Sequence, residues 1–97
     1  MLTSDQIALC LAYQQCIDEE SDPMGDMIVL ARKDATCCMC GQLALAGTHH
    51  RVETARVDGV PRSCRYCELC CAAMAESWED DGAEVERRVA LFREVPA

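Results

Sequence analysis

Apolar residues recur at helical spacing near both ends of the chain, and a different pattern occupies the middle. Near the start, Thr3 followed by Gln6 forms a capping-box pattern, and the run after it lacks glycine and proline. These features predict a helix over residues 4–19. Because its apolar residues cover two faces, one of them needs a further neighbour, and a homodimer formed through this helix is one way to cover it.

The stretch 22–33 favours a second short helix, because Asp22 suits the N-cap position and Pro23 the first helical position. Gly25 weakens a helix here, and the run MIVLA also fits a strand, since it is too short for its period to decide. We predict the helix and keep the strand as the alternative.

Alternation marks the middle of the chain. Two extended runs, 50–57 and 60–66, flank Asp58-Gly59. An Asp-Gly pair favours a type I′ turn, because both turn positions need a positive φ. The sequence therefore predicts a β-hairpin.

Helical spacing returns after residue 67 and forms one apolar stripe, made of Cys71, Met74, Ala75 and Trp78. The sequence DDG interrupts it, and Asp81 with Glu84 can cap a final helix. The apolar stripe expected on that helix consists of Val85, Val89 and Phe92. Whether one kinked helix or two helices form is left open by the pattern.

Nine cysteines among 97 residues are the strongest chemical signal. An odd number, and an acidic Asp5 where a signal peptide needs positive charge, favour reduced thiols in a cytoplasmic protein. Two C-x2-C pairs, Cys37 with Cys40 and Cys67 with Cys70, together supply four sulfurs. Such a set suits one structural Zn²⁺ ion in tetrahedral coordination.

Neighbouring cysteines leave the ligand register open. Cys38, Cys64 and Cys71 adjoin the four chosen residues, and one alternative pairs Cys64 with Cys67. An iron–sulfur cluster is an alternative to zinc, because residues 64–70, CRYCELC, contain the C-x2-C-x2-C spacing of bacterial ferredoxins. The x3-C-P continuation of that motif is missing. Cys71, Cys10 and Cys16 are expected to be small buried side chains.

The order of knuckle, hairpin and a second C-x2-C entering a helix resembles the treble-clef zinc finger over about residues 37–79. The resemblance rests on Cys37, Cys40, Gly41, the Asp58-Gly59 turn, Cys67 and Cys70. It implies that the last two ligands lie where the helix begins, so that the positive helix end faces the thiolates.

His49 and His50 follow the first pair in a layout similar to HNH nucleases, in which one histidine of such a pair activates water beside a divalent ion. The chain departs from that family in two ways. It contains no asparagine, and Cys71 stands where that family has its last metal-ligating histidine. Exposed residues at a strand end are the alternative for both histidines, and a zinc-ligand role for either is a further one. We therefore assign no catalytic residues.

The formal charge of −8 is unevenly distributed. Residues 1–36 carry two basic and seven acidic side chains, residues 37–67 four and two, and residues 68–97 three and eight. The two acidic ends disfavour a nucleic acid, and they favour a protein partner with a basic surface. The sequence has no run near 18 apolar residues, so we expect no membrane partner. Nucleic-acid binding through the arginines of the hairpin is an alternative; these are Arg51, Arg56, Arg62 and Arg65.

Together these patterns predict a small α+β protein with helices flanking a β-hairpin and one zinc site. We expect a single domain over 1–97, with a helical N-terminal part (1–36), a zinc-binding knuckle, hairpin and helix (37–79), and a C-terminal helix (80–97). The expected function is that of a protein-interaction or regulatory module, an adaptor or inhibitor, and an HNH-like metal-dependent nuclease is the alternative.

Overall fold

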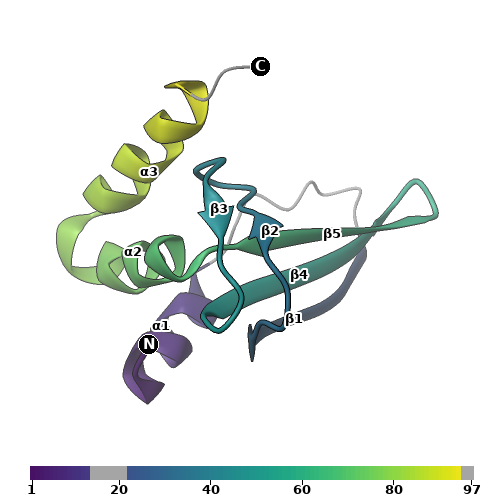
Figure 1. The fold of residues 1–97 in the computed structure, drawn as a ribbon, viewed down its shortest axis with the longest axis horizontal. Helices are drawn as coiled ribbons and strands as arrows, with labels where there is room; N and C mark the ends of the chain where they lie inside the picture. Colours follow the sequence, from purple (N-terminus) through teal and green to yellow (C-terminus); the bar gives the residue numbers. More distant parts are fainter. Residues whose placement is uncertain (14–21, 95–97) are drawn as a thin grey trace.

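The computed structural model describes residues 1–13 and 22–94, and Figure 1 shows its ribbon. The described elements follow one another along the chain in this order: α1 (Ser4–Ala12), β1 (Asp22–Leu30), β2 (Ala35–Thr36), β3 (Leu43–Ala44), β4 (His49–Val57), β5 (Val60–Tyr66), α2 (Glu68–Asp80) and α3 (Ala83–Glu94). The predicted α+β class, with helices flanking a hairpin, is confirmed.

Two antiparallel sheets form the β part. The larger has the order β1-β4-β5, and the smaller pairs β2 with β3. The helices gather at one end of the larger sheet, and the turn between β4 and β5 points away from them (Figure 1). α2 contacts α1, α3 and β4, so it is the element around which the other helices are arranged.

The predicted hairpin is confirmed as β4 and β5. Asp58 and Gly59 form its turn with φ of 52° and 78°. Both values lie in the left-handed region that a type I′ turn needs. In the register of the sheet, Arg51 lies between Ile28 of β1 and Tyr66 of β5.

The helix predicted at 22–33, and with it the wholly helical character of residues 1–36, is wrong. Residues 22–30 form strand β1 against β4, which is the alternative that MIVLA allowed. Pairing with β4 stabilises the strand more than Asp22 and Pro23 stabilise a helix start. A register shift between Pro23 and Gly25 accommodates these two residues, which both disfavour a regular strand.

The first predicted helix is confirmed at its start and shorter at its end. Both hydrogen bonds of the Thr3–Gln6 capping box are present, while Tyr13 takes an extended backbone that ends α1 at Ala12. Residues 14–19 of the predicted helix, including Cys16, lie outside the described residues.

Two helices follow β5, separated by Asp81 and Gly82 with φ of 55° and 84°. The residue that caps α3 is Asp80 and not the predicted Asp81: its carboxylate accepts the backbone N–H groups of Gly82 and Glu84 at 2.9 and 3.2 Å. Across the described ranges 1–13 and 22–94, no helix is long and apolar enough to span a membrane.

Candidate metal centre

A tight turn between β2 and β3 carries the first cysteine pair. The Cys37 N–H donates to the Gln42 carbonyl at 2.9 Å, and the Gly41 N–H donates back to the Cys37 carbonyl at 3.0 Å. Gly41 has a φ of 71°, which glycine adopts without strain and which reverses the chain after Cys40. This local geometry turns both sulfurs of the pair to the same side.

The second pair begins α2. Cys67 is its N-cap residue and makes no side-chain capping bond, and Cys70 lies in the first turn. The Cys67 N–H points instead at the Cys37 sulfur, 3.3 Å away, and the Met39 N–H lies 3.4 Å from the same sulfur. Backbone donors and the positive end of α2 therefore face the sulfur cluster and stabilise negative charge on it.

The four sulfurs converge on one buried point. Their atoms all lie within 4.8 Å of one another, and all four residues are buried. The Sγ atoms of Cys37 and Cys70 are 3.7 Å apart, and those of Cys40 and Cys67 are 3.8 Å apart. A tetrahedron with metal–sulfur bonds of about 2.3 Å has edges of about 3.8 Å. The spacing therefore fits a four-coordinate metal ion and is far too long for disulfides.

A buried arginine closes the cluster from the side of α3. The guanidinium of Arg88 lies 3.4 Å from the Cys40 sulfur, 3.5 Å from that of Cys70 and 3.8 Å from that of Cys67. Arg88 is only 8% exposed. Within the part of the chain that the structure describes, no carboxylate forms an ion pair with it. A buried guanidinium needs an anionic partner, and a metal bound by four thiolates supplies one.

The sequence analysis did not identify Arg88 as part of the site. One signal was available: Arg88 lies three residues after Val85, on the face that α3 buries. The predicted stripe is correct at Val85 and wrong at Val89 and Phe92, which are exposed.

The thiols of the cluster perturb one another's acidity. The pKa of Cys37 is lowered far below the usual thiol range, because the Cys67 and Cys70 thiols and two backbone groups hydrogen-bond to its sulfur. The hydrogen bond with Cys37 raises the pKa of Cys67 to about 11, and bonds with Cys37 and Cys67 raise the pKa of Cys70. The protein itself thus favours a thiolate at Cys37, and a cation must displace protons from Cys67 and Cys70.

The competing cysteines lie outside the cluster of four. Cys38 is exposed and Cys64 half-buried, and the alternative ligand set with Cys64 is not the one that converges. Cys71 and Cys10 are buried as expected, with the Cys71 sulfur directed at the Tyr66 carbonyl. The eight cysteines of the described ranges are all free thiols.

The expectation that both histidines are exposed is wrong. His50 is fully buried, with Nε2 3.0 Å from the Leu45 carbonyl oxygen. His49 is half-buried, and its Nδ1 accepts the backbone N–H of Leu2. Neither histidine belongs to the sulfur cluster, and the burial of His50 keeps it from reaching a phosphate group.

Arg51 is not part of a basic surface on the hairpin. It is 1% exposed, and its guanidinium pairs with both carboxylate oxygens of Asp26 at 2.9 and 2.7 Å. It also donates to the carbonyls of Cys10 and Tyr13 at the end of α1. The carboxylate of Asp26 keeps the guanidinium charged and its pKa raised despite burial. Arg51 is therefore a structural cross-link between α1, β1 and β4.

Comparison of the chain with protein-family models, with curated proteins and with solved structures found no match.

Proposed function

We propose that this protein holds one structural Zn²⁺ ion through Cys37, Cys40, Cys67 and Cys70, in an arrangement of the treble-clef type. The observation that carries the proposal is the convergence of four buried sulfurs at tetrahedral spacing. The order of the elements also supports it. A knuckle between β2 and β3 supplies the first pair, the β4–β5 hairpin follows, and the second pair begins α2.

The chemistry of the four ligands supports a structural role for the ion. Catalytic zinc sites keep one position for water or substrate, whereas four protein thiolates fill a tetrahedron. All four cysteines are buried, and the Arg88 guanidinium lies against three of their sulfurs. Thiolate sets of this geometry select zinc, with iron as the competing ion.

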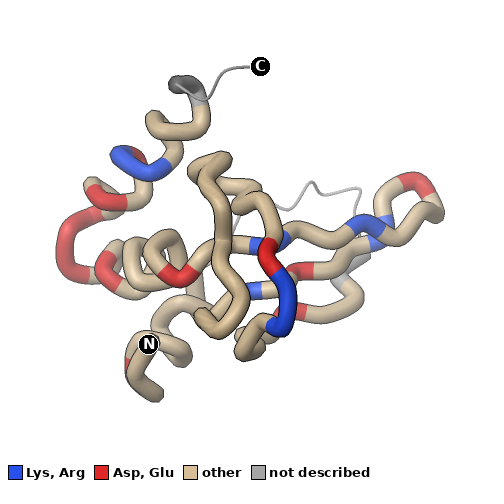
Figure 2. Tube along the Cα trace, in the orientation of Figure 1, with Lys and Arg blue, Asp and Glu red and all other residues tan. Residues whose placement is uncertain are grey.

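With a structural ion, the function belongs to the surface that the ion stabilises. We propose a protein-interaction module whose partner carries a basic surface. The supporting observations are the acidic residues around the corner between α2 and α3 (Figure 2) and several exposed large apolar side chains on the helices. The latter are Leu9, Leu69, Trp78, Val89 and Phe92. Protein interfaces combine such apolar anchors with a polar rim.

Native mass spectrometry of the purified protein tests the metal proposal. We expect one zinc ion per chain, and loss of the ion in Cys37→Ser and in Cys70→Ser. Cys38→Ser and Cys64→Ser are the matched controls. Each removes a cysteine that is close to the cluster in sequence but is not one of its four ligands, so both variants should retain the ion. A protein that is folded without any metal, or that loses zinc equally in all four variants, contradicts the proposal.

A further inference from the structure

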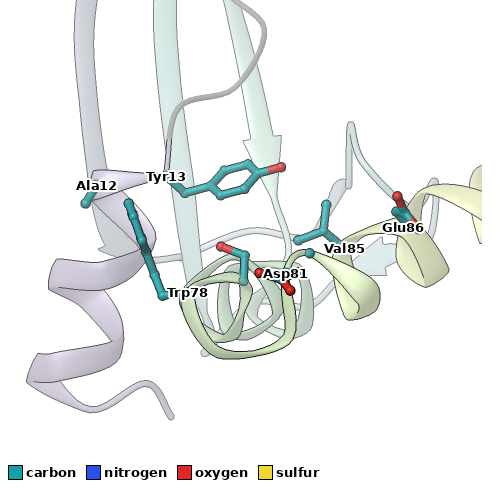
Figure 3. A pocket seen from close by; sticks show the side chains of 8 residues that line it. Ala12, Tyr13, Trp78, Asp81, Val85 and Glu86 are labelled. Atoms are coloured by element: carbon teal, nitrogen blue, oxygen red, sulfur yellow. The ribbon is translucent and has the colours of Figure 1, made fainter.

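A pocket of about 710 Å³ lies where the end of α1 meets the corner between α2 and α3 (Figure 3). It is separate from the sulfur cluster, and its volume is in the range of small-ligand sites. Aromatic and acidic side chains line it together with small residues: Ala12, Tyr13, Ser77, Trp78, Asp81, Gly82, Val85 and Glu86.

Trp78 gives the pocket an exposed but fixed aromatic wall. The side chain is 59% exposed, yet its indole Nε1–H donates to the Leu9 carbonyl of α1 at 3.2 Å. Figure 3 shows this ring beside the end of α1, with the Tyr13 ring extending over the pocket. A ring held in place by a hydrogen bond loses little conformational freedom when a ligand stacks on it.

The charges that line the pocket are all negative. Asp81 and Glu86 contribute carboxylates, and neither forms an ion pair with a described residue. The last turn of α2 has no basic residue, so its carbonyl ends add negative partial charge. The start of α3 would oppose this, but the Asp80 carboxylate accepts its first N–H groups and offsets their charge.

Nearby arginines do not neutralise these carboxylates. Arg87 is paired with Glu84 at 2.6 Å, and Arg88 faces the sulfurs of the metal centre. Arg51 already occupies the carbonyls at the end of α1, on the core side. The pocket therefore offers aromatic faces and two unpaired carboxylates in one place.

We propose that this pocket binds an arginine or lysine side chain from a basic peptide segment of a partner protein. A cation over an aromatic face gains electrostatic stabilisation from the ring, and adjacent carboxylates add charge attraction. Charge complementarity between a protein of net charge −8 and a basic segment brings the two together. The inference rests on the proposed interaction function and names the chemistry of the partner.

Trp78 is the only tryptophan of the chain, so its fluorescence reports on this pocket alone. The experiment titrates zinc-loaded protein, verified by native mass spectrometry, with a capped peptide of alternating glycine and arginine. A peptide with glutamine in place of arginine is the neutral control. We expect saturable quenching by the arginine peptide and none by the neutral peptide.

Two double variants of equal charge separate local from general attraction. Asp81→Asn/Glu86→Gln removes the pocket carboxylates, and asparagine tolerates the left-handed backbone of residue 81. Glu76→Gln/Glu79→Gln removes two exposed carboxylates of α2 that do not line the pocket. We expect the first to weaken peptide binding about tenfold and the second by less than about threefold.

Trp78→Leu, measured by calorimetry, should abolish binding, while Phe92→Leu, which changes another exposed aromatic residue, should preserve it. Equal weakening in both double variants, or a dimer of this chain that dissociates in Trp78→Leu, would overturn the inference. If the zinc-loaded protein does not bind the arginine peptide, only the proposal for the pocket is wrong. Loss of zinc binding instead removes the function proposed above.

Discussion

Replacing Arg88 with glutamine tests whether the sulfur cluster carries negative charge in the folded protein. The change removes a guanidinium that contacts three of the four sulfurs at 3.4, 3.5 and 3.8 Å. Glutamine is shorter and uncharged, so it cannot replace these contacts together. Because Arg88 is 8% exposed, water cannot fully take over its role.

The expected effect follows from the number and length of these contacts. A hydrogen bond that involves a charged group contributes about 1.5–3 kcal/mol, and two of the three contacts are within the usual range for sulfur acceptors. Because the two contacts share one guanidinium, their joint contribution is smaller than twice this value, and we expect zinc binding to weaken by about 2–4 kcal/mol. At about 1.4 kcal/mol for each tenfold change, this is roughly a 30-fold to 700-fold increase in Kd.

Competition with a chromogenic zinc chelator at fixed pH measures this change. Arg87→Gln is the matched control, since it removes the same charge from the neighbouring position, where the arginine is exposed and pairs with Glu84. We expect it to alter Kd by about twofold or less. Arg88→Lys keeps the charge without the planar fork and should give an intermediate Kd. Equal Kd values for Arg88→Gln and Arg87→Gln would refute the reasoning.

Two further predictions concern protons and the second buried arginine. Zinc affinity should fall as pH falls, because the raised pKa values of Cys67, about 11, and Cys70 keep both protonated at neutral pH until zinc displaces the protons. Calorimetry in buffers of different ionisation enthalpy should detect about two or more protons released per ion; release of fewer contradicts the assignment. Arg51→Met should destabilise the zinc-loaded protein by about 3–5 kcal/mol, since it leaves Asp26 and two carbonyls without their partner. Urea denaturation measures this, and Arg56→Met, at an exposed position, should change stability by less than about 0.5 kcal/mol.

Local sequence was sufficient where the structure depends on local geometry. The two C-x2-C pairs, the Asp58-Gly59 turn and the Thr3–Gln6 capping box each encode their backbone within a few residues, and the structure has all three features. The α+β class followed from these elements. The common feature is that no distant partner was needed to form them.

Tertiary pairing decided the features that the sequence did not reveal. Residues 22–30 form a strand only because β4 offers an edge to pair with, and the N-terminal helix signal at Asp22 was therefore misleading. His50 differs, because its Nε2 lies 3.0 Å from the carbonyl of Leu45, only five residues earlier in the loop between β3 and β4. The β4 partner of residues 22–30 lies outside the window that a periodicity argument uses, and a contact made by a loop leaves no periodic signal.

Two arginines show why counting charges in the sequence does not locate the charged surface of the protein. Arg51 and Arg88 contribute to the basic count of the sequence, yet both are buried and face internal anionic or carbonyl groups. The charge of Arg51 is offset by Asp26, and Arg88 faces the sulfur cluster. Neither cation is available to phosphates, so two of the counted arginines do not support nucleic-acid binding.

Arg88 also connects the metal centre to the pocket. It anchors α3 to the sulfurs, and α3 contributes Val85 and Glu86 to the wall of the pocket. Without a metal ion, the raised pKa values of Cys67 and Cys70 keep both thiols protonated, so the buried guanidinium loses negative charge at two of its three sulfur contacts. The position of α3 then rests on the packing of Val85 and Leu91 and on the Asp80 cap. We therefore expect the proposed pocket to bind the arginine peptide less tightly once zinc is removed, although the pocket lining includes none of the four cysteines.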